Sequence, residues 1–364
     1  MRTESEYVQW LMSVPGVGYL RCRRLLERFG SAEAVWDAAE PELLQVASIT
    51  PNIAREICRS KRTYSFREQA DFLSRSGIRV IHQTDPEYPP VLLQIPDPPH
   101  ILFVKGEFSP TDQRSIAVVG ARNATNYGLL VTNKLCTELA AGGVTIISGL
   151  AIGIDATAHA AALQAGGRTI AVLACGLLRV YPPQNRLLAE RISRQGVLLS
   201  EFSPFTHAHP GMFPIRNRLI AGLARGVLVV EAARKSGSLI TADQALEQGR
   251  DVFAVPGPIT SPLSQGTNDL IRQGAKMITG VEEIWEEYPD WCANQYPVKS
   301  TGSVRMTAEE RILLDTIGYG AVHVEHLLRA CRLPKGEVHR LLLELELKGL
   351  IRQMPGQMYM RCTV

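Results

Sequence analysis

Residues 116–155 read IAVVGARNATNYGLLVTNKLCTELAAGGVTIISGLAIGID, and this stretch decides the fold. Two apolar, β-branched runs each end in a glycine-containing loop, and a segment of helical length separates them. Further runs of this kind begin near residues 169, 197, 227, 252 and 276, each leaving room for one helix and two loops before the next. Repeated strand–helix units with buried strands predict a parallel, doubly wound α/β sheet.

Smaller modules flank the predicted sheet. Residues 1–75 predict short helices, and two apolar pieces at 78–81 and 101–104 are candidates for additional strands. Residues 289–305 have the composition of a linker, and residues 306–364 predict three helices followed by a β-hairpin, as in a winged helix. We therefore expect a helical domain at 1–75, an α/β domain at 76–288, a linker at 289–305 and a winged-helix domain at 306–364.

Composition limits the classes of partner. The chain has 39 basic and 36 acidic residues among 364, a net charge of +3, and residues 76–301 carry 19 of each sign. A nucleic acid would therefore have to bind through a focused patch and backbone donors rather than through bulk charge. The seven cysteines are scattered and form no Cys-x-x-Cys pair, which indicates a reducing cytoplasm without disulfides or zinc. No apolar run reaches the roughly 18–20 residues of a membrane span, so we expect no membrane contact.

The loops after the strands are the expected ligand site, because ligands of doubly wound sheets bind beyond the carboxyl ends of the strands. Gly120 permits a tight turn, and Arg122 beside it can hold a phosphate in its guanidinium fork. Ser148 and Gly149 open the loop after the second strand, where Asp155 is placed to cap the next helix. The spacing is not G-x-G-x-x-G and no Walker A motif is present, so we expect a phosphate or sugar-phosphate ligand rather than NAD or ATP.

The densest polar cluster is FPIRNR at residues 213–218. The Phe213 ring beside Arg216, Asn217 and Arg218 suits a single nucleic-acid strand, because a base can stack on the ring while the arginines hold its phosphate. Such stacking contributes roughly 1–3 kcal/mol per base. The alternative is that Phe213 fills a gap in the core and the arginines form ion pairs. Ser236 and Gly237 form another helix start that suits an anion.

Motifs of catalysis are missing from the sequence. Neither G-x-S-x-G nor H-E-x-x-H occurs. His159, His207 and His209 lie nearest the loops but have neither metal-site nor triad spacing, so we predict structural or surface roles for them. We predict no enzymatic activity, no catalytic residue, no metal and no cofactor.

Four motifs in a fixed order carry a family resemblance: SGLAIGID at 148–155, FPIRNR at 213–218, SGSLITA at 236–242 and VPG at 255–257. With the proline-rich lead-in around Asp85–Pro89 and Asp97–Pro99, the set closely resembles the DNA-processing protein A (DprA, or Smf) family of bacteria. The resemblance covers essentially the whole chain. It implies an extended Rossmann-like sheet, an N-terminal helical module like a sterile alpha motif, and a C-terminal winged helix.

The resemblance also implies a function. Proteins of this family are non-catalytic, bind single-stranded DNA, protect incoming strands during natural transformation and load the recombinase RecA. A homodimer formed through the Rossmann-like domain is implied as well. By motif position, the resemblance assigns strand binding to Gly120, Arg122, Phe213, Arg216, Asn217 and Arg218, with the Ser148–Gly149 and Ser236–Gly237 loops around them. Ala121 departs from the serine of many members, so a hydroxyl contact is lost there.

Two alternatives remain open. The same sheet resembles that of nucleoside-monophosphate phosphoribohydrolases, whose chemistry here would have to use Glu231 or Asp243. The winged helix could instead make the protein a duplex-binding regulator. The basic and acidic residues of its third helix nearly cancel, which favours an accessory or partner-binding role.

Overall fold

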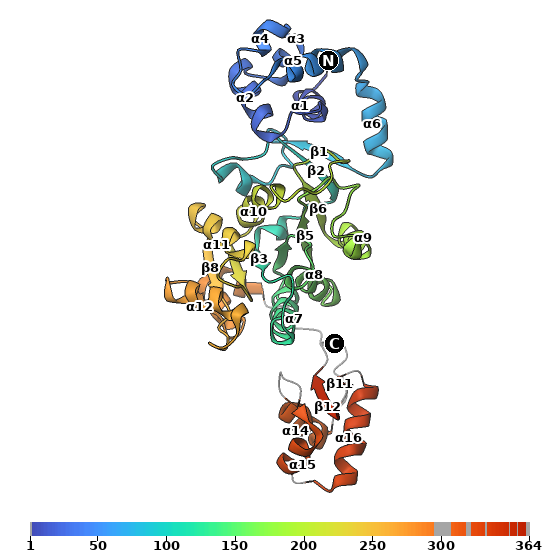
Figure 1. Cartoon of the computed structure of the whole chain (residues 1–364), viewed down its shortest axis with the longest axis vertical. Helices are drawn as coiled ribbons and strands as arrows, with labels where there is room; N and C mark the ends of the chain where they lie inside the picture. The colour runs from blue at the N-terminus through green and yellow to red at the C-terminus, as the bar shows by residue number, and fades with distance from the viewer. Residues whose placement is uncertain are drawn as a thin grey trace.

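The computed structural model describes residues 2–294, 307–317, 322–331, 333–348, 350–354 and 356–361. A large sheet with helices on both faces forms one body, and a group of short helices covers one end of it (Figure 1). The doubly wound α/β architecture and the C-terminal winged helix are both confirmed.

Six helices form the N-terminal part: α1 (Glu4–Ser13), α2 (Tyr19–Phe29), α3 (Ala32–Asp37), α4 (Glu40–Leu43), α5 (Pro51–Thr63) and α6 (Phe66–Arg75). All six lie within residues 1–75, for which the sequence predicts short helices. The start of α1 is encoded, because Thr3 and Glu6 form a capping box in which each side chain accepts a hydrogen bond from the other residue's backbone N–H. This helix buries Trp10, whose ring centroid lies 4.6 Å from that of Trp36.

Nine strands form the main sheet: β1 (Arg79–His82), β2 (Ile101–Gly106), β3 (Ser115–Val119), β4 (Thr145–Ser148), β5 (Thr169–Val172), β6 (Val197–Ser200), β7 (Gly226–Val229), β8 (Asp251–Ala254) and β9 (Lys276–Met277). Their spatial order is β1-β2-β6-β5-β4-β3-β7-β8-β9. Strands β3–β9 pair in parallel, whereas β1 and β2 add an antiparallel edge. The two apolar pieces before the main repeat are therefore strands, as predicted.

The central strands are buried on both faces. Every residue of β3–β7 is buried, which is why these strands read as continuous apolar runs. Seven helices connect or follow the parallel strands: α7 (Asn126–Ala141), α8 (Ile154–Gln164), α9 (Arg186–Gln195), α10 (Met212–Leu223), α11 (Gly237–Glu247), α12 (Gln265–Arg272) and α13 (Glu282–Glu287). Helices α7, α8 and α13 share one apolar cluster with the sheet, and α10, α11 and α12 share another.

The strand order reverses between β3 and β7. From β3 the chain adds β4, β5 and β6 on one side, and it then returns to place β7, β8 and β9 on the other. The helices that follow β3 and β7 belong to different apolar clusters, so the loops after these two strands diverge. A crevice opens at such a switch point, and this is where doubly wound sheets bind ligands.

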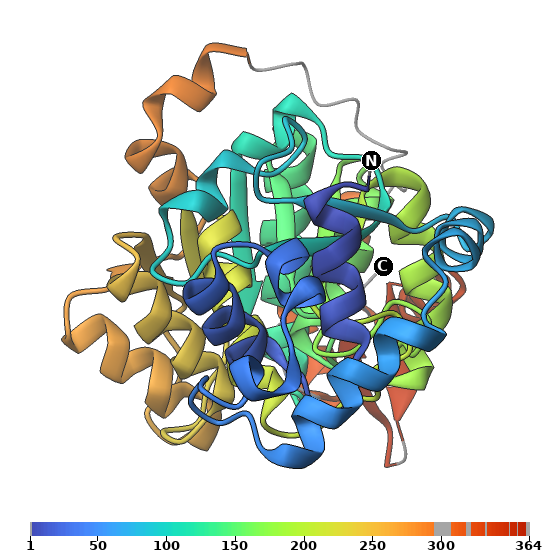
Figure 2. The ribbon, with the colours of Figure 1, turned by 90° about the horizontal axis from the view of Figure 1, so that it is seen from above.

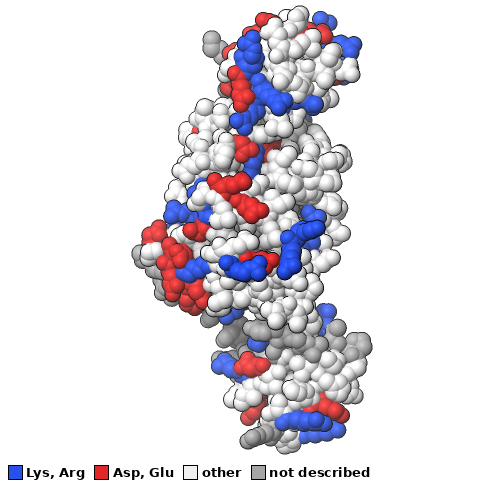
Figure 3. Space-filling model, turned by 60° about the vertical axis from the view of Figure 1, so that its left-hand side comes forward, with Lys and Arg blue, Asp and Glu red and all other residues white. Residues whose placement is uncertain are grey.

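The N-terminal helices pack directly against the main sheet. Their buried side chains form one apolar cluster with β2, with Leu198 of β6 and with Ile192 of α9. Figure 2, seen from above these helices, shows them lying over the sheet. On the face shown in Figure 3, basic and acidic side chains are interspersed, as expected from a net charge near zero.

The predicted linker begins later than composition suggested. Residues Pro289–Asn294 form a 3-10 helix, and Trp291 is buried with its ring stacked on Tyr288 at 4.2 Å between centroids. The packed body thus extends six residues past the predicted boundary, because a buried tryptophan outweighs a linker-like composition. Residues 295–305 of the predicted linker, and residue 306 after it, lie outside the described residues.

The C-terminal part has its own apolar core, made by side chains such as Leu313, Leu327 and Leu341. Its elements are α14 (Ala308–Ile317), β10 (Val322–His323), α15 (Val324–Ala330), α16 (Lys335–Leu347), β11 (Ile351–Met354) and β12 (Met358–Arg361). A capping box starts α14, since Thr307 N–H donates to Glu310 at 2.8 Å and Glu310 N–H donates to the Thr307 hydroxyl at 3.2 Å. Among the helices described, none is both long and apolar enough to cross a bilayer.

Candidate nucleic-acid interface

A cavity of about 390 Å³ opens at the switch point, between the loops after β3 and β7 and the start of α10. Seven predicted site residues line it: Gly120, Arg122, Phe213, Arg216, Asn217, Ser236 and Gly237. Three others do not: Ser148, Gly149 and Arg218. Residues more than 100 positions apart in the sequence are thus brought together by the crossing of the chain between β6 and β7.

Arg122 and Phe213 form the accessible part of the cavity. The Arg122 guanidinium is exposed and lies over the Phe213 ring, 5.0 Å from its centroid. Within the described residues, this guanidinium makes no hydrogen bond or ion pair, so all of its N–H donors are available. A free cation above a half-buried aromatic ring offers both a phosphate partner and a stacking surface.

Arg216 is a buried cation in the wall of the same cavity. It is only 4% exposed, donates to Gly149 O at 2.7 Å and to Val172 O, and donates through Nε to Asn217 Oδ1 at 3.1 Å. Burial lowers the pKa of Arg216 to about 10, while the nearby Asp155 carboxylate opposes this shift. The guanidinium therefore remains charged at neutral pH and holds positive potential at the wall of the cavity.

Ser148 and Gly149, at the end of β4 and the start of the following loop, support Arg216 rather than line the cavity. The Ser148 hydroxyl donates to Val118 O at 2.6 Å, which joins the ends of β3 and β4. Gly149 has to be a glycine, because a Cβ there would lie 2.6 Å from the Arg216 guanidinium. Both residues thus support the site from behind it.

Asp155 has a different role from the one predicted. The N-cap residue, just before α8, is Gly153, which provides no side-chain cap. The Asp155 carboxylate instead accepts from Gly149 N–H at 3.1 Å and from Ala151 N–H at 3.3 Å, which closes the preceding loop. Burial raises the pKa of Asp155, and the Arg216 charge opposes this rise. An acidic residue just after a glycine-containing loop is a local signal that could have predicted these hydrogen bonds. The Arg216 charge that acts on the carboxylate comes from 61 positions away, so no local pattern predicts it.

The start of α11 forms the opposite side of the cavity. Ser236 caps the helix, since its hydroxyl accepts from Ser238 N–H at 3.3 Å. A Cβ on Gly237 would meet no atom within 4 Å, so this wall is open. Asn217 reaches across to it through a long hydrogen bond of 3.4 Å to Gly237 O.

Arg218 lies away from this cavity, and its prediction as a cavity residue requires correction. Its guanidinium is buried, forms ion pairs with Glu201 and with Asp97 (Nε–Oδ2, 3.1 Å), and lies 4.9 Å from the centroid of the Tyr19 ring. Positions 213 and 216 are one helical turn apart and share a face, whereas position 218 is rotated by about 200° from 216. The ion-pair alternative considered for these arginines therefore holds for Arg218.

The carboxylates that a hydrolase would need are not available. The Glu231 carboxylate is buried and accepts from Thr125 N–H at 2.8 Å and from its hydroxyl at 2.5 Å, at the start of α7. Asp243 is on α11 and does not line the cavity, whose one acidic lining residue is Asp155. The nucleoside-monophosphate hydrolase alternative is therefore not favoured.

One aromatic neighbour escaped the sequence analysis. The Tyr181 ring lies edge-on to Phe213, with 6.0 Å between centroids, and is 48% exposed. It comes from the loop between β5 and α9, 32 residues before Phe213. No local pattern distinguishes this tyrosine, because its importance depends on where two separate loops meet.

Comparison with known proteins agrees with this geometry. A family model described as DNA recombination-mediator protein A matches residues 79–289, and a DprA winged helix domain matches residues 300–357. The DNA processing protein DprA of Bacillus subtilis (strain 168) is 48% identical over 62% of this chain and 74% of that protein. The protein Smf of Escherichia coli (strain K12) is 45% identical over 74% of each chain.

Two solved structures are similar over most of their length. DprA from Streptococcus pneumoniae has a TM-score of 0.66 and 35% identity, with coverage of 79% of this chain and 98% of that one. DprA from Helicobacter pylori, described by its single-stranded DNA binding mode, has a TM-score of 0.53 and 30% identity, with coverage of 58% and 96%. The matched models, the relatives and the shared fold together show that this chain belongs to the DNA recombination-mediator protein A (DprA/Smf) family.

Proposed function

We propose that this protein is a single-stranded DNA-binding recombination mediator that binds the strand at the switch-point cavity. The observation that carries the proposal is the free Arg122 guanidinium over the Phe213 ring, beside the buried charge of Arg216. The helical start at Ser236–Gly237 adds backbone donors to the opposite wall. The single-strand binding described for the Helicobacter pylori relative supports the same assignment.

The geometry favours a single strand over a duplex. The Phe213 ring lies in the wall of a cavity, so a base has to leave its stack to reach it. Within a duplex, the bases are stacked on one another and a side chain meets only their edges. In the free protein, Arg122 covers one face of the ring, so binding moves this side chain from the ring toward a phosphate.

Two substitutions test the site by fluorescence anisotropy with a labelled oligothymidylate. Arg122→Ala should weaken binding and reduce the slope of log K against log salt by about 0.7, the value for one single-strand phosphate contact. Phe213→Ala should lose roughly 1–3 kcal/mol with a smaller change in slope, because stacking releases few counterions. Lys134→Ala on α7 is the matched control, because this exposed lysine is outside the cavity lining. Folded variants that bind like the parent chain would place the site elsewhere.

We further propose that the protein is not an enzyme, works in the cytoplasm as a homodimer formed through the Rossmann-like domain, and loads RecA during natural transformation. The five cysteines whose side chains the structure describes have free thiols, which suits a reducing compartment. A test of RecA loading measures the lag in RecA ATPase on single-stranded DNA with and without this protein, and loading predicts a shorter lag.

Light scattering tests the homodimer, and a monomeric mass at working concentration would remove that part of the proposal.

A further inference from the structure

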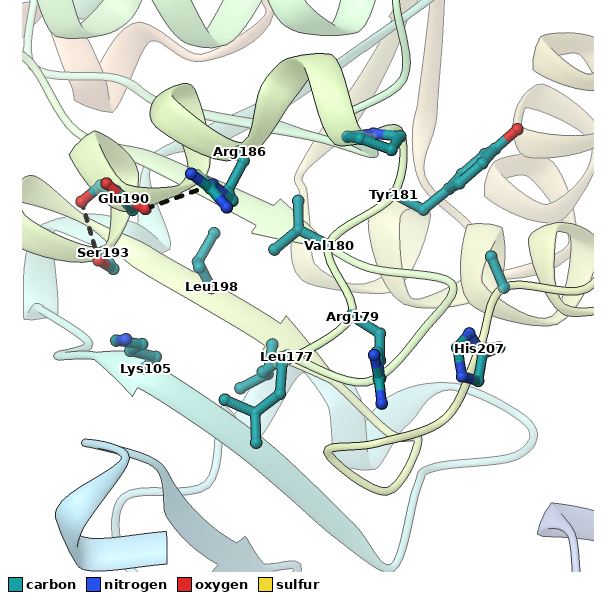
Figure 4. A pocket seen from close by; sticks show the side chains of 14 residues that line it. Lys105, Leu177, Arg179, Val180, Tyr181, Arg186, Glu190, Ser193, Leu198 and His207 are labelled. Atoms are coloured by element: carbon teal, nitrogen blue, oxygen red, sulfur yellow. Dashed lines mark hydrogen bonds and ion pairs between the residues drawn. The ribbon is translucent and has the colours of Figure 1, made fainter.

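A second cavity, of about 570 Å³, lies beside the first (Figure 4). The loop after β5, the start of α9, strands β2 and β6 and the loop after β6 all contribute to it. None of the residues predicted from the sequence as strand-binding lines this cavity.

The rim of the second cavity is cationic. Figure 4 shows Lys105 and Arg179 on either side of Leu177, with Arg186 across the cavity from Lys105. In the described part of the chain, neither the Lys105 ammonium nor the Arg179 guanidinium has a hydrogen bond or ion pair. Arg186 has only a long contact of 3.9 Å with Glu190, and both of these side chains are largely exposed. Three cations thus face one carboxylate around an opening, which favours an anionic ligand.

The floor of the cavity is apolar. Leu177 and Leu198 are buried beneath the rim, and Val180 packs beside them. The Tyr181 ring stands at the edge and is 48% exposed. A purely ionic ligand such as inorganic phosphate would make no favourable contact with this apolar floor, whereas an unstacked base can pack its π-face against it.

Tyr181 joins the two cavities. It lines the second cavity, and its ring contacts Phe213, which lines the first, with 6.0 Å between the centroids and 60° between the planes. The two rings are in contact, with the Arg122 guanidinium over Phe213 and Arg179 two residues before Tyr181 in the same loop, so stacking and charged groups follow one another from the first cavity to the second. This continuity favours a nucleic-acid strand over an acidic peptide as the ligand of the second cavity. A peptide bound in the second cavity alone would not need an aromatic contact with the first cavity.

We propose that the second cavity is a further nucleotide subsite, which binds the part of the same single strand that leaves the first cavity past Tyr181. In this arrangement Arg179 and Lys105 hold phosphates, and a base packs on Tyr181 above Leu177 and Leu198. The inference rests on the proposed function, since it extends the path of a strand bound at Phe213. It also predicts that binding affinity depends on the length of the strand, because a strand that fills only the first cavity makes no contact with the second.

The first test compares two lengths of oligothymidylate, about 4 and about 16 nucleotides, which bracket the site sizes of single-strand-binding folds. Arg179→Ala and Lys105→Ala should each weaken binding of the longer strand by roughly tenfold, in line with the loss of one charged contact, and leave the short strand unaffected. Arg122→Ala should weaken both lengths, and Lys134→Ala should weaken neither. Equal losses for both lengths, or no loss for either, would overturn the second subsite.

The second test locates the strand directly. Oligothymidylates with 5-iodouracil at successive positions should photocrosslink to Phe213 from one position and to Tyr181 or His207 from a position further along. Adducts at Phe213 without any at Tyr181 or His207 would overturn the second subsite and leave the proposed function standing. If the parent chain bound neither length and formed no adduct at Phe213, the proposed function itself would be wrong.

Discussion

At the scale of single residues, the burial of His159 shows that its role is structural. The sequence had left a structural role and a surface role open for this histidine. Its Nδ1 lies 2.6 Å from the Thr169 hydroxyl, and that hydroxyl donates its one proton to Ile146 O at 2.6 Å. Nδ1 therefore has to be the protonated nitrogen, and the buried Nε2 has no partner in the described structure. Burial, with a smaller contribution from the Arg216 charge, lowers the pKa of His159 from 6.5 to about 3. The structural role predicted for this histidine agrees with its surroundings.

This geometry predicts a pH dependence of stability. Between pH 6.5 and about 3 the unfolded chain protonates His159 and the folded chain does not. The unfolded state thus binds more protons, and the free energy of unfolding should fall with decreasing pH by up to about 1.4 kcal/mol per unit from this residue. Urea denaturation of the parent chain and of His159→Gln across this window should give the steeper fall in the parent. Parallel curves would show that His159 does not titrate in this way.

At the scale of elements, the turn that starts α8 sets the position of the Arg122 loop. Gly153 has a φ of +79°, and a Cβ there would lie 2.4 Å from the carbonyl oxygens of Ala121 and Arg122. Gly166, after the same helix, has a similar φ of +73° but open space around it. An alanine at Gly166 therefore meets only a backbone penalty, whereas an alanine at Gly153 meets a steric clash in addition to the penalty of a backbone at φ +79° and ψ −126°.

The predicted outcome is a difference between two alanine variants. Gly166→Ala should cost about 1–2 kcal/mol, the conformational penalty alone. Gly153→Ala should cost about 1–3 kcal/mol more, because the clash with backbone atoms cannot be relieved by a side-chain movement. It should also weaken single-strand binding, since the loop that carries Arg122 has to move. Urea denaturation and anisotropy measure the two effects, and equal stabilities of the variants would contradict the steric argument.

At the scale of the whole molecule, charge is arranged to disfavour coating of a duplex. In the winged helix, Arg340 pairs with Glu337 and with Glu344, and Lys348 pairs with Glu310 at 2.5 Å. Cations already paired within a domain add little to the neutralisation of phosphates. Arg122, Arg179 and Lys105, which have no hydrogen-bond or ion-pair partner among the described residues, lie on the α/β body, around its two cavities.

We therefore expect the whole chain to bind a single strand at least about tenfold more tightly than a duplex of the same length at physiological salt. A chain that ends at Asn294 should keep its single-strand affinity within about threefold. The cut belongs after residue 294, because Trp291 is part of the core of the α/β body. Anisotropy with both DNA forms gives the comparison, and a large loss of single-strand affinity on truncation would assign strand binding to the winged helix.

The sequence by itself determined the class of fold and most of the site. Strand and helix periods are local, so the repeated apolar runs from residue 116 predicted the parallel sheet, and the loops with Gly120 and Ser236 predicted the cavity at which we propose that a ligand binds. The i, i+3 spacing of Phe213 and Arg216 was also local information, and it places the two on one face of α10.

The tertiary structure alone decided which charges are free. Arg122 has no partner in the described chain, Arg216 is held by the carbonyls of Gly149 and Val172, and Arg218 is neutralised by Glu201 and Asp97. These partners lie between 17 and 121 residues away from the arginines, so no local pattern reports them. The same holds for Tyr181, which meets Phe213 only because the loops after β5 and β6 end at the same edge of the sheet. Pairing over such distances depends on strand order, and strand order is a property of the folded chain.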